Sequence, residues 1–265
     1  MTLLSASFLD LAHIERKFLL TSSESLFTAQ LMILHGCASA SQLQKIAIFQ
    51  ALDAVQIKAL LPFSYWQEYQ PGEIIMIEGE DIPGKLYCLI AGLLEIKKTS
   101  ISTGKEAIIR LISGGELFAA SAIFGNGIAP ATVVCLAPSQ VLTIEREALL
   151  EVISQVPEIS FRILSVYNER LQQLHNIVQS LIAEKPLMRL IKLIQYYQSF
   201  YGTSSYKGEN LLNIPLTYDQ MSRSIGISYE ECVRLFKQLN GTVGYRRGGK
   251  IIIQDRYKLA DLQIT

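Results

Sequence analysis

The sequence has few of the residues that build catalytic and metal sites. It contains only three histidines and four cysteines, which are His13, His35, His175, Cys37, Cys88, Cys135 and Cys232. No histidine has a metal-ligand neighbour at a usable spacing, and the cysteines stand far apart in apolar surroundings, so we expect small buried hydrophobes rather than a disulfide framework or metal cluster. Paired carboxylates in a glycine-lined cleft, a nucleophile elbow and a phosphate-binding Gly-Lys-Ser are also missing, so we do not expect an enzyme.

Long apolar runs and a net charge are lacking too. No run approaches the roughly 18 apolar residues of a membrane span, and no basic segment followed by an apolar stretch and a cleavage site opens the chain, so we expect a cytoplasmic protein. The formal net charge of zero excludes a uniformly basic coat. From Pro186 onward, however, the chain has 11 lysines and arginines and six aspartates and glutamates. The part before Pro186 has 13 lysines and arginines and 18 aspartates and glutamates. This asymmetry predicts one domain that faces phosphate and one that does not.

The most informative stretch is 216–239, LTYDQMSRSIGISYEECVRLFKQL. Thr217 with Gln220, and Ser228 with Glu231, have the spacing of two capping boxes, which mark two helix starts. Between them lies Gly226, which suits the left-handed residue at a helix end. Apolar side chains at matching positions of both helices would form one small core, so the stretch predicts a helix-turn-helix. They are Met221, Ile225, Ile227, Cys232 and Leu235.

The second helix of this motif carries side chains that can read bases. A carboxylate accepts from the cytosine amino group and a guanidinium binds guanine in two places, so Glu230 and Arg234 suit a major groove. The candidate base-reading residues are Tyr229, Glu230, Val233 and Arg234, and the candidate phosphate contacts include Thr217, Ser228 and Lys237. The alternative is that Glu230 and Arg234 form an ordinary surface ion pair four residues apart.

A second basic feature follows the motif. In 244–253, GYRRGGKIII, Gly248-Gly249 signals a two-residue hairpin turn with Arg246, Arg247 and Lys250 at its tip. A basic hairpin beside a recognition helix is typical of a winged helix-turn-helix, in which the wing touches phosphate. A turn that merely aids solubility is the alternative.

The earlier part of the chain is predicted to be a β-roll followed by a long helix. Between Phe63 and Ile144, turn residues recur about every ten positions, and 86–97 and 107–112 are predicted strands that face each other across 102–105. After Pro157 a helix is expected to about Ile182, with an apolar seam at alternating spacings of three and four. The seam comprises Leu164, Tyr167, Leu171, Leu174, Val178 and Leu181. A narrow seam with polar flanks favours a two-fold dimer over an intramolecular core.

The segments around these elements are less informative. Glu184-Lys185-Pro186 interrupts the long helix and is interpreted as a hinge. A further amphipathic helix is expected over 186–201, followed by a polar loop over 202–213. One helix is expected over 44–61. Residues 1–42 form an extension to which the sequence assigns no role, and a start at Met32 would give a more compact chain.

The order of β-roll, long helix, hinge and winged helix-turn-helix resembles the cyclic-AMP receptor protein/FNR superfamily of bacterial transcription regulators. The resemblance covers about Gln44 to the C-terminus, and 69–96 is similar to the family's first strands. Ser228, Glu230 and Arg234 match the family's Ser-x-Glu-x-x-x-Arg, where the glutamate and arginine contact bases. Tyr229 stands where the cyclic-AMP receptor protein has a guanine-reading arginine, which implies a different operator.

The effector pocket departs from the family pattern. The corresponding stretch, 115–132, includes Gly115, Ala119, Ala120, Pro130, Ala131 and Thr132. Ala119-Ala120 replaces the Gly-Glu pair that cradles ribose, and Pro130-Ala131 replaces the Arg-Ser pair that binds phosphate. Without charge-assisted partners for these groups, cyclic AMP is not expected to bind. The cysteine cluster of oxygen-sensing members is absent, so an iron–sulfur cluster is not expected.

The resemblance leaves the effector unknown. Haem and small metabolites such as 2-oxoglutarate stay open, because relatives with proline-containing pockets sense them. Arg170 or His175 on the long helix could contribute to such a site, and the alternative is that both are surface or interhelical groups.

The predicted fold is α+β, with an N-terminal antiparallel β-roll of the cyclic-nucleotide-binding type, a long dimerisation helix and a C-terminal winged helix-turn-helix. The expected units are 1–42, 43–156 for the roll, 157–184 for the helix and hinge, and 185–265 for the winged unit. The resemblance implies a homodimeric regulator whose partners are palindromic double-stranded DNA, itself and RNA polymerase. The alternative function is a ligand-binding or protein-interaction module whose helix-turn-helix is only structural.

Overall fold

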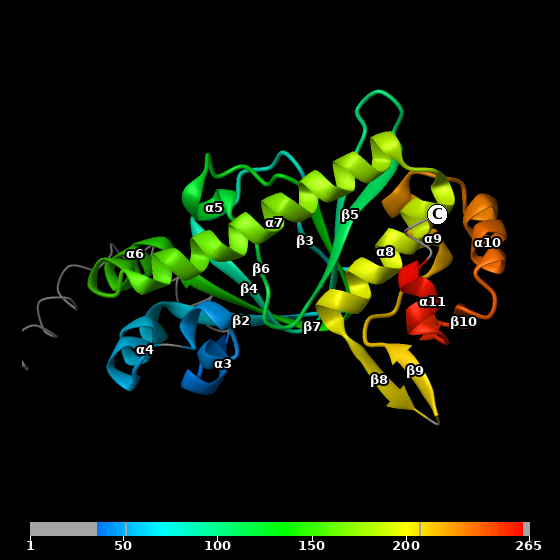
Figure 1. Cartoon of the computed structure of the whole chain (residues 1–265). Coiled ribbons are helices and arrows are strands. Elements are labelled where there is room, and N and C mark those ends of the chain that lie inside the picture. Colours follow the sequence, from blue (N-terminus) through cyan, green and yellow to red (C-terminus); the bar gives the residue numbers. More distant parts are fainter. Residues whose placement is uncertain (1–35, 51, 207, 262–265) are drawn as a thin grey trace, which may run out of the picture.

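The computed structural model describes residues 36–50, 52–206 and 208–261. Most of the expected N-terminal extension, residues 1–35, lies outside this range. In Figure 1 a β-roll occupies one part of the molecule, a long helix runs along its side, and the C-terminal helices gather at the end of that helix. The α+β architecture predicted from the sequence is confirmed.

The roll is built from seven strands in one antiparallel sheet. Its path order is β1-β2-β7-β4-β5, with β3 paired to β7 and β6 to β4. The strands are β1 (Gly36–Cys37), β2 (Ser64–Tyr69), β3 (Ile74–Met76), β4 (Lys85–Thr99), β5 (Glu106–Ser113), β6 (Leu117–Phe118) and β7 (Thr132–Glu145). The predicted hairpin across 102–105 is confirmed, because β4 and β5 pair from Leu93 with Ser113 to Thr99 with Glu106.

Short helices flank the strands of the roll. They are α3 (Ala40–Gln44), the 3-10 helix η1 (Ala47–Phe49), α4 (Ala54–Leu60), the 3-10 helix η2 (Leu61–Phe63), α5 (Ser121–Phe124) and α6 (Arg146–Gln155). The single helix expected over 44–61 is therefore wrong. Asp53 starts a new helix within it, since its carboxylate accepts from the amides of Val55 and Gln56 at 2.8 and 2.9 Å.

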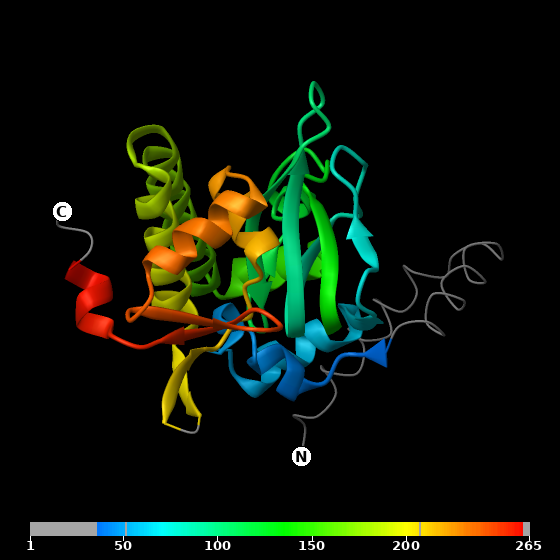
Figure 2. The same cartoon turned by 90° about the vertical axis from the view of Figure 1, so that its right-hand side faces the viewer.

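The long helix α7 (Glu158–Ala183) begins directly after Pro157, as predicted, and α8 (Pro186–Tyr201) returns beside it. Glu184 and Lys185 connect the two helices in an extended conformation. The turn back brings α8 against the free edge of the roll, and Figure 2 shows the C-terminal helices beside the β4–β5 hairpin.

The C-terminal unit combines α8 and three further helices with a second sheet. The helices are α9 (Tyr218–Ile225), α10 (Tyr229–Gln238) and α11 (Arg256–Asp261), and the strands are β8 (Thr203–Tyr206), β9 (Glu209–Leu212), β10 (Val243–Arg246) and β11 (Lys250–Ile253). The strand order is β10-β11-β9-β8. The stretch 202–213 is thus a hairpin rather than the expected loop, because β9 pairs with the wing strand β11 and gains tertiary hydrogen bonds that local polarity does not reveal.

Candidate nucleic-acid interface

The first helix of the motif, α9, is capped at both ends. The Gln220 amide donates to the Thr217 hydroxyl at 3.2 Å and the Thr217 amide donates to the Gln220 side chain at 2.9 Å, which completes the predicted capping box. Gly226 ends the helix in the left-handed conformation at φ 68°. The Arg189 guanidinium of α8 donates to the Ile225 carbonyl at 2.8 Å, so α8 holds this helix end.

The second helix, α10, has a simpler start than expected. The Ser228 hydroxyl accepts from the Glu231 amide at 3.1 Å. The reciprocal bond of the predicted capping box is not formed, because the Glu231 carboxylate lies 3.5 Å from the Arg234 guanidinium. This ion pair also differs from the alternative expected from sequence, in which Arg234 pairs with Glu230.

The two helices share an apolar core. Met221, Ile225, Cys232 and Leu235 are all buried, as the spacing predicted, and Ile227 is partly buried against the same core. Burial raises the pKa of the Cys232 thiol to about 12, so this residue acts as a small apolar group. Cys88 and Cys135 are buried as well, whereas Cys37 is exposed and differs from the expectation. The core fixes the angle between α9 and α10 and therefore the direction of the outer face of α10.

That outer face carries the predicted reader residues. Tyr229, Glu230, Arg234 and Lys237 are exposed, and Val233 is partly buried. Because α9 packs on the opposite side of α10, these side chains form a surface that no described segment covers. Such a face can donate to and accept from base edges and phosphate oxygens.

An aromatic cluster that sequence reasoning missed ties the wing to the two helices. The Tyr218 ring stacks on Tyr245 of β10 with centroids 4.0 Å apart, and it meets Phe236 and Tyr229 edge-on at 5.4 and 6.1 Å. Tyr218 immediately follows a helix cap, but nothing local in the sequence connects it to Tyr245. The cluster sets the position of the wing beside the reader face and supports the Tyr229 ring.

The wing differs in detail from the expected two-residue turn. Arg246 pairs with Lys250, which leaves a three-residue loop of Arg247, Gly248 and Gly249. A β-carbon on Gly249 would lie 2.9 Å from the Leu216 amide nitrogen, so glycine is required where the wing meets the start of the motif. Arg247 and Lys250 are exposed, whereas the Arg246 guanidinium lies 2.7 Å from the Glu209 carboxylate of β9. The free cationic tip is therefore centred on Arg247.

The effector stretch is largely aliphatic. Ala131 is buried and Ala119 packs against the apolar cluster inside the roll. Thr132 accepts from the Glu78 amide at 3.0 Å, and the Pro130 carbonyl accepts from the Lys98 ammonium at 3.0 Å. Gly115 and Ala120 are partly buried at either end of the short segment before α5. Ala119, Ala120, Pro130 and Ala131 themselves carry no charged side chain, and the Lys98 ammonium reaches this stretch at the Pro130 carbonyl.

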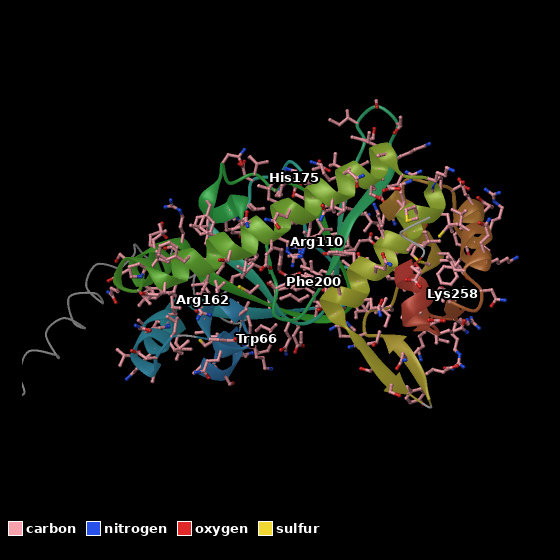
Figure 3. The ribbon with its side chains drawn as sticks, viewed as in Figure 1. Trp66, Arg110, Arg162, His175, Phe200 and Lys258 are labelled. Atoms are coloured by element: carbon pink, nitrogen blue, oxygen red, sulfur yellow. The ribbon has the colours of Figure 1, made fainter. Side chains whose placement is uncertain are left out.

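Charged groups gather instead between the roll and α7. The Glu116 carboxylate accepts from Arg110 of β5 at 3.0 Å and from Arg170 of α7. Burial, followed by the neighbouring Arg170, lowers the pKa of Arg110. The Arg170 guanidinium also lies 4.6 Å from the centre of the Phe200 ring. Figure 3 labels Arg110 and Phe200 beneath α7, and His175, the other candidate of this helix, on its exposed side.

The seam of α7 is mostly open in the single chain. Five of its six predicted members are between 42% and 63% exposed, namely Leu164, Leu171, Leu174, Val178 and Leu181. Tyr167 differs, because it packs within its own chain edge-on to Phe124 with ring centroids 6.3 Å apart. Ile159 and Ile163 on the other side of the helix are buried against the roll. The seam is thus an apolar stripe that faces away from the chain's own core.

Two absences apply to the described part of the chain. Within residues 36–50, 52–206 and 208–261, no three His, Cys, Asp or Glu side chains are grouped so that they could hold a metal ion. None of the helices in these ranges is long and apolar enough to cross a membrane.

Comparisons with known proteins agree with the fold. The model of the cyclic nucleotide-binding domain matches residues 66–156. A CRP-like cAMP-activated global transcriptional regulator of Mycobacterium tuberculosis is 26% identical over 220 residues, which cover 82% of this chain and 96% of the relative.

Solved structures extend the likeness in fold beyond the roll. FixK2 from Bradyrhizobium japonicum superposes with a TM-score of 0.64 at 16% identity, covering 75% of this chain and 96% of FixK2. A CooA mutant from Carboxydothermus hydrogenoformans superposes with a TM-score of 0.65 at 13% identity, covering 81% of this chain and 93% of the CooA chain. With its roll, long helix and winged helix-turn-helix, the chain is similar to members of the cyclic-AMP receptor protein/FNR superfamily of bacterial transcription regulators.

Proposed function

We propose that the chain acts as a homodimeric, sequence-specific DNA-binding transcription regulator with an effector other than cyclic AMP. The observation that carries this proposal is the outer face of α10, where Tyr229, Glu230, Arg234 and Lys237 are exposed beside a cationic wing tip. A helix that is anchored by its inner face and polar on its outer face suits insertion into a major groove. Arg234 and Glu230 would read bases, while Thr217, Ser228 and Lys237 would contact phosphate.

The wing would add contacts to the DNA backbone. Arg247 and Lys250 are free to approach phosphate, whereas Arg246 would first have to leave Glu209. Phosphate contacts position the protein without reading sequence, so the wing would contribute affinity and the reader helix specificity. RNA polymerase would be a further partner of such a regulator.

The exposed seam of α7 supports the dimer. An apolar stripe with heptad spacing on a 26-residue helix is unfavourable in water unless a second helix covers it. A second copy of α7 offers the same stripe, and packing about a two-fold axis would make the interface self-complementary. Two reader helices would then enter successive major grooves about one helical turn apart, which implies a palindromic operator.

The aliphatic side chains in the effector stretch support an effector that carries no phosphate at the family's usual position. The relative from Mycobacterium tuberculosis is described as cAMP-activated, but in this chain Ala119-Ala120 and Pro130-Ala131 offer neither a carboxylate nor a guanidinium. A buried phosphate there would lose its charge-assisted partners. Cyclic AMP should therefore leave the melting temperature unchanged, because a ligand that does not bind the folded state cannot stabilise it.

The proposal is tested by selecting random double-stranded DNA with the purified full-length protein and sequencing the retained fragments. We expect a palindromic motif with two half-sites about one helical turn apart. Retained fragments without a shared motif, at low salt as well as at physiological salt, would instead favour a structural helix-turn-helix. Sedimentation of the same preparation shows whether the protein is a dimer.

A further inference from the structure

The helix α8 contacts the roll through two tyrosines one helical turn apart. The Tyr197 hydroxyl accepts from the Leu111 amide at 3.1 Å, and the Tyr201 hydroxyl lies 3.0 Å from the Leu111 carbonyl. Leu111 belongs to β5, the last strand in the order β1-β2-β7-β4-β5 of the roll sheet. Its amide and carbonyl point away from β4, toward the side of β5 on which this order has no further strand. The Tyr197 hydroxyl thus accepts from the Leu111 amide where a further strand would otherwise supply a carbonyl.

The tyrosine contact is largely buried. Tyr197 is 1% exposed, and its ring stacks on Tyr201 with centroids 5.8 Å apart and an interplanar angle of 18°. Burial raises the pKa of both phenols, so both hydroxyls keep their protons at neutral pH. Leu93, Ile108 and Leu111 of the roll join the apolar core of the winged unit around Tyr197. The winged unit is therefore packed on the edge strand of its own chain.

Glu116 connects this contact to α7. A tyrosine hydroxyl has one proton, and the shorter distance of 2.7 Å and the negative charge assign the Tyr201 proton to the Glu116 carboxylate. The same carboxylate accepts from Arg110, from Arg170 of α7 and from the Ser113 amide at 2.9 Å. One side chain thus holds the roll, the seam helix α7 and the winged unit together.

A second contact fixes the other side of the winged unit. The Arg223 guanidinium of α9 lies 2.7 Å from the Glu106 carboxylate of β5 and 3.6 Å from that of Glu95. The chain connection between α7 and α8 consists of two extended residues, Glu184 and Lys185, which by themselves permit rotation of the unit. The contacts to β5 and Glu116 add to the restraint from the ion pair between Glu184 and Lys192 of α8, whose charged atoms lie 2.6 Å apart.

The geometry points to Tyr197 and Tyr201, together with Glu116, as positioning residues that set the location of the reader helix relative to the seam of α7. This inference rests on the proposed function. In a dimer joined at the seam, the separation of the two reader helices depends on how firmly each winged unit is held to α7. Loosening the tyrosine contact lets each unit move independently, so the dimer loses its preference for one half-site spacing while each α10 still reads the same bases.

The test uses the Tyr197→Phe/Tyr201→Phe double variant, which keeps both rings and removes both hydroxyls. Tyr65→Phe is the matched control, because it removes a hydroxyl bonded to the Pro62 carbonyl at 3.0 Å, distant from the winged unit. Amide hydrogen exchange of 106–113 is followed in the full-length protein without DNA. We expect exchange at Leu111 to be roughly tenfold faster in the double variant and unchanged in the control.

Binding is then measured to the selected operator and to versions whose half-sites are one or two base pairs closer or farther apart. The wild type and Tyr65→Phe should prefer one spacing, and the double variant should bind that operator more weakly with a flattened spacing preference. Base preference within each half-site should stay the same. Glu116→Gln, which removes the charge that holds Arg110 and Arg170, should flatten the spacing preference in the same way.

The outcomes separate the two proposals. Unchanged exchange at Leu111 would show that the tyrosine contact does not restrain β5, and faster exchange with an intact spacing preference would show that the contact does not position the reader helix. Either result overturns the inference while the proposed function stands. Failure of the wild type to select any motif would reject the proposed function and the role in spacing together.

Discussion

The Arg223 guanidinium on α9 lies 2.7 Å from the Glu106 carboxylate on β5, although 117 residues separate them in the chain. Lys97 donates to the same carboxylate at 2.7 Å, and Glu95 approaches Arg223 from the inner side at 3.6 Å. The two acids respond oppositely to this shared arrangement. The hydrogen bond from Lys97 lowers the pKa of Glu106, whereas burial raises that of Glu95 despite the nearby Arg223.

These opposite shifts predict a specific pH dependence. Glu106 contributes stability that is complete above its ordinary pKa of 4.5 and is lost as the pH falls through its lowered value. Glu95 binds a proton more readily when folded, so its contribution is complete below 4.5 and is lost as the pH rises through its raised value. The free energy of unfolding, measured with denaturant at a series of pH values, should fall less steeply toward acid in Glu106→Gln than in the wild type. In Glu95→Gln it should fall less steeply as the pH rises above 4.5. If the free energy of unfolding of both variants depended on pH as it does in the wild type, these assignments would be contradicted.

Arg234→Ala should weaken specific DNA binding by about 1–3 kcal/mol, because a bidentate contact to guanine is lost. It should also relax base preference at one position of each half-site. Titrations against the selected operator and its single-base variants measure both effects. Lys237→Ala is the control, since loss of a phosphate contact should weaken all sequences alike. If Arg234→Ala kept full preference at every position, Arg234 would not belong to the readout.

The two wing arginines should behave differently. Arg247→Ala should reduce the slope of log affinity against log salt by about 1, because one phosphate contact no longer releases a counterion. Arg246→Ala should reduce it less, since the Arg246 guanidinium is held 2.7 Å from Glu209. Titrations of both variants over a range of salt concentrations give the slopes. Equal reductions would mean that Arg246 leaves Glu209 when DNA binds.

Leu174→Glu should dissociate the dimer. If Leu174 packs against its symmetry mate, the change places two carboxylates in a desolvated interface, where each costs several kcal/mol. Operator affinity should fall with it, although no DNA-facing residue has changed. His175→Glu introduces the same charge one residue away on an exposed side chain and should remain dimeric. Sedimentation of both variants decides this, and a dimeric Leu174→Glu would require a different interface.

Gly226→Ala should destabilise the winged unit by roughly 1–2 kcal/mol, because an alanine pays a steric cost in the left-handed conformation. Gly226 has a φ of 68°, and an added β-carbon would meet nothing closer than Arg189 at 3.9 Å, so the cost is that of the backbone alone. Gly84→Ala is the control, since Gly84 has no positive φ and its nearest neighbour would lie at 3.6 Å. Thermal unfolding should show a lower midpoint for Gly226→Ala only.

The sequence by itself determined the features that depend on neighbouring residues. The start of α9 at Thr217, its end at Gly226, the start of α7 after Pro157 and the β4–β5 hairpin all follow from hydrogen bonds and conformational preferences within a few positions. Periodicity also placed the apolar seam of α7 and the small core of the helix-turn-helix, because side chains three or four residues apart share one face of a helix.

Only the tertiary structure decided which distant residues meet. The stack of Tyr218 on Tyr245, the pairing of Arg246 with Glu209 and the contact of Tyr201 with Glu116 join residues from separate elements. Such contacts depend on where whole helices and strands come to rest, and that placement follows from burial of their apolar faces rather than from any local pattern. The same reason explains why 202–213, polar in sequence, became a hairpin once β11 offered it a free edge.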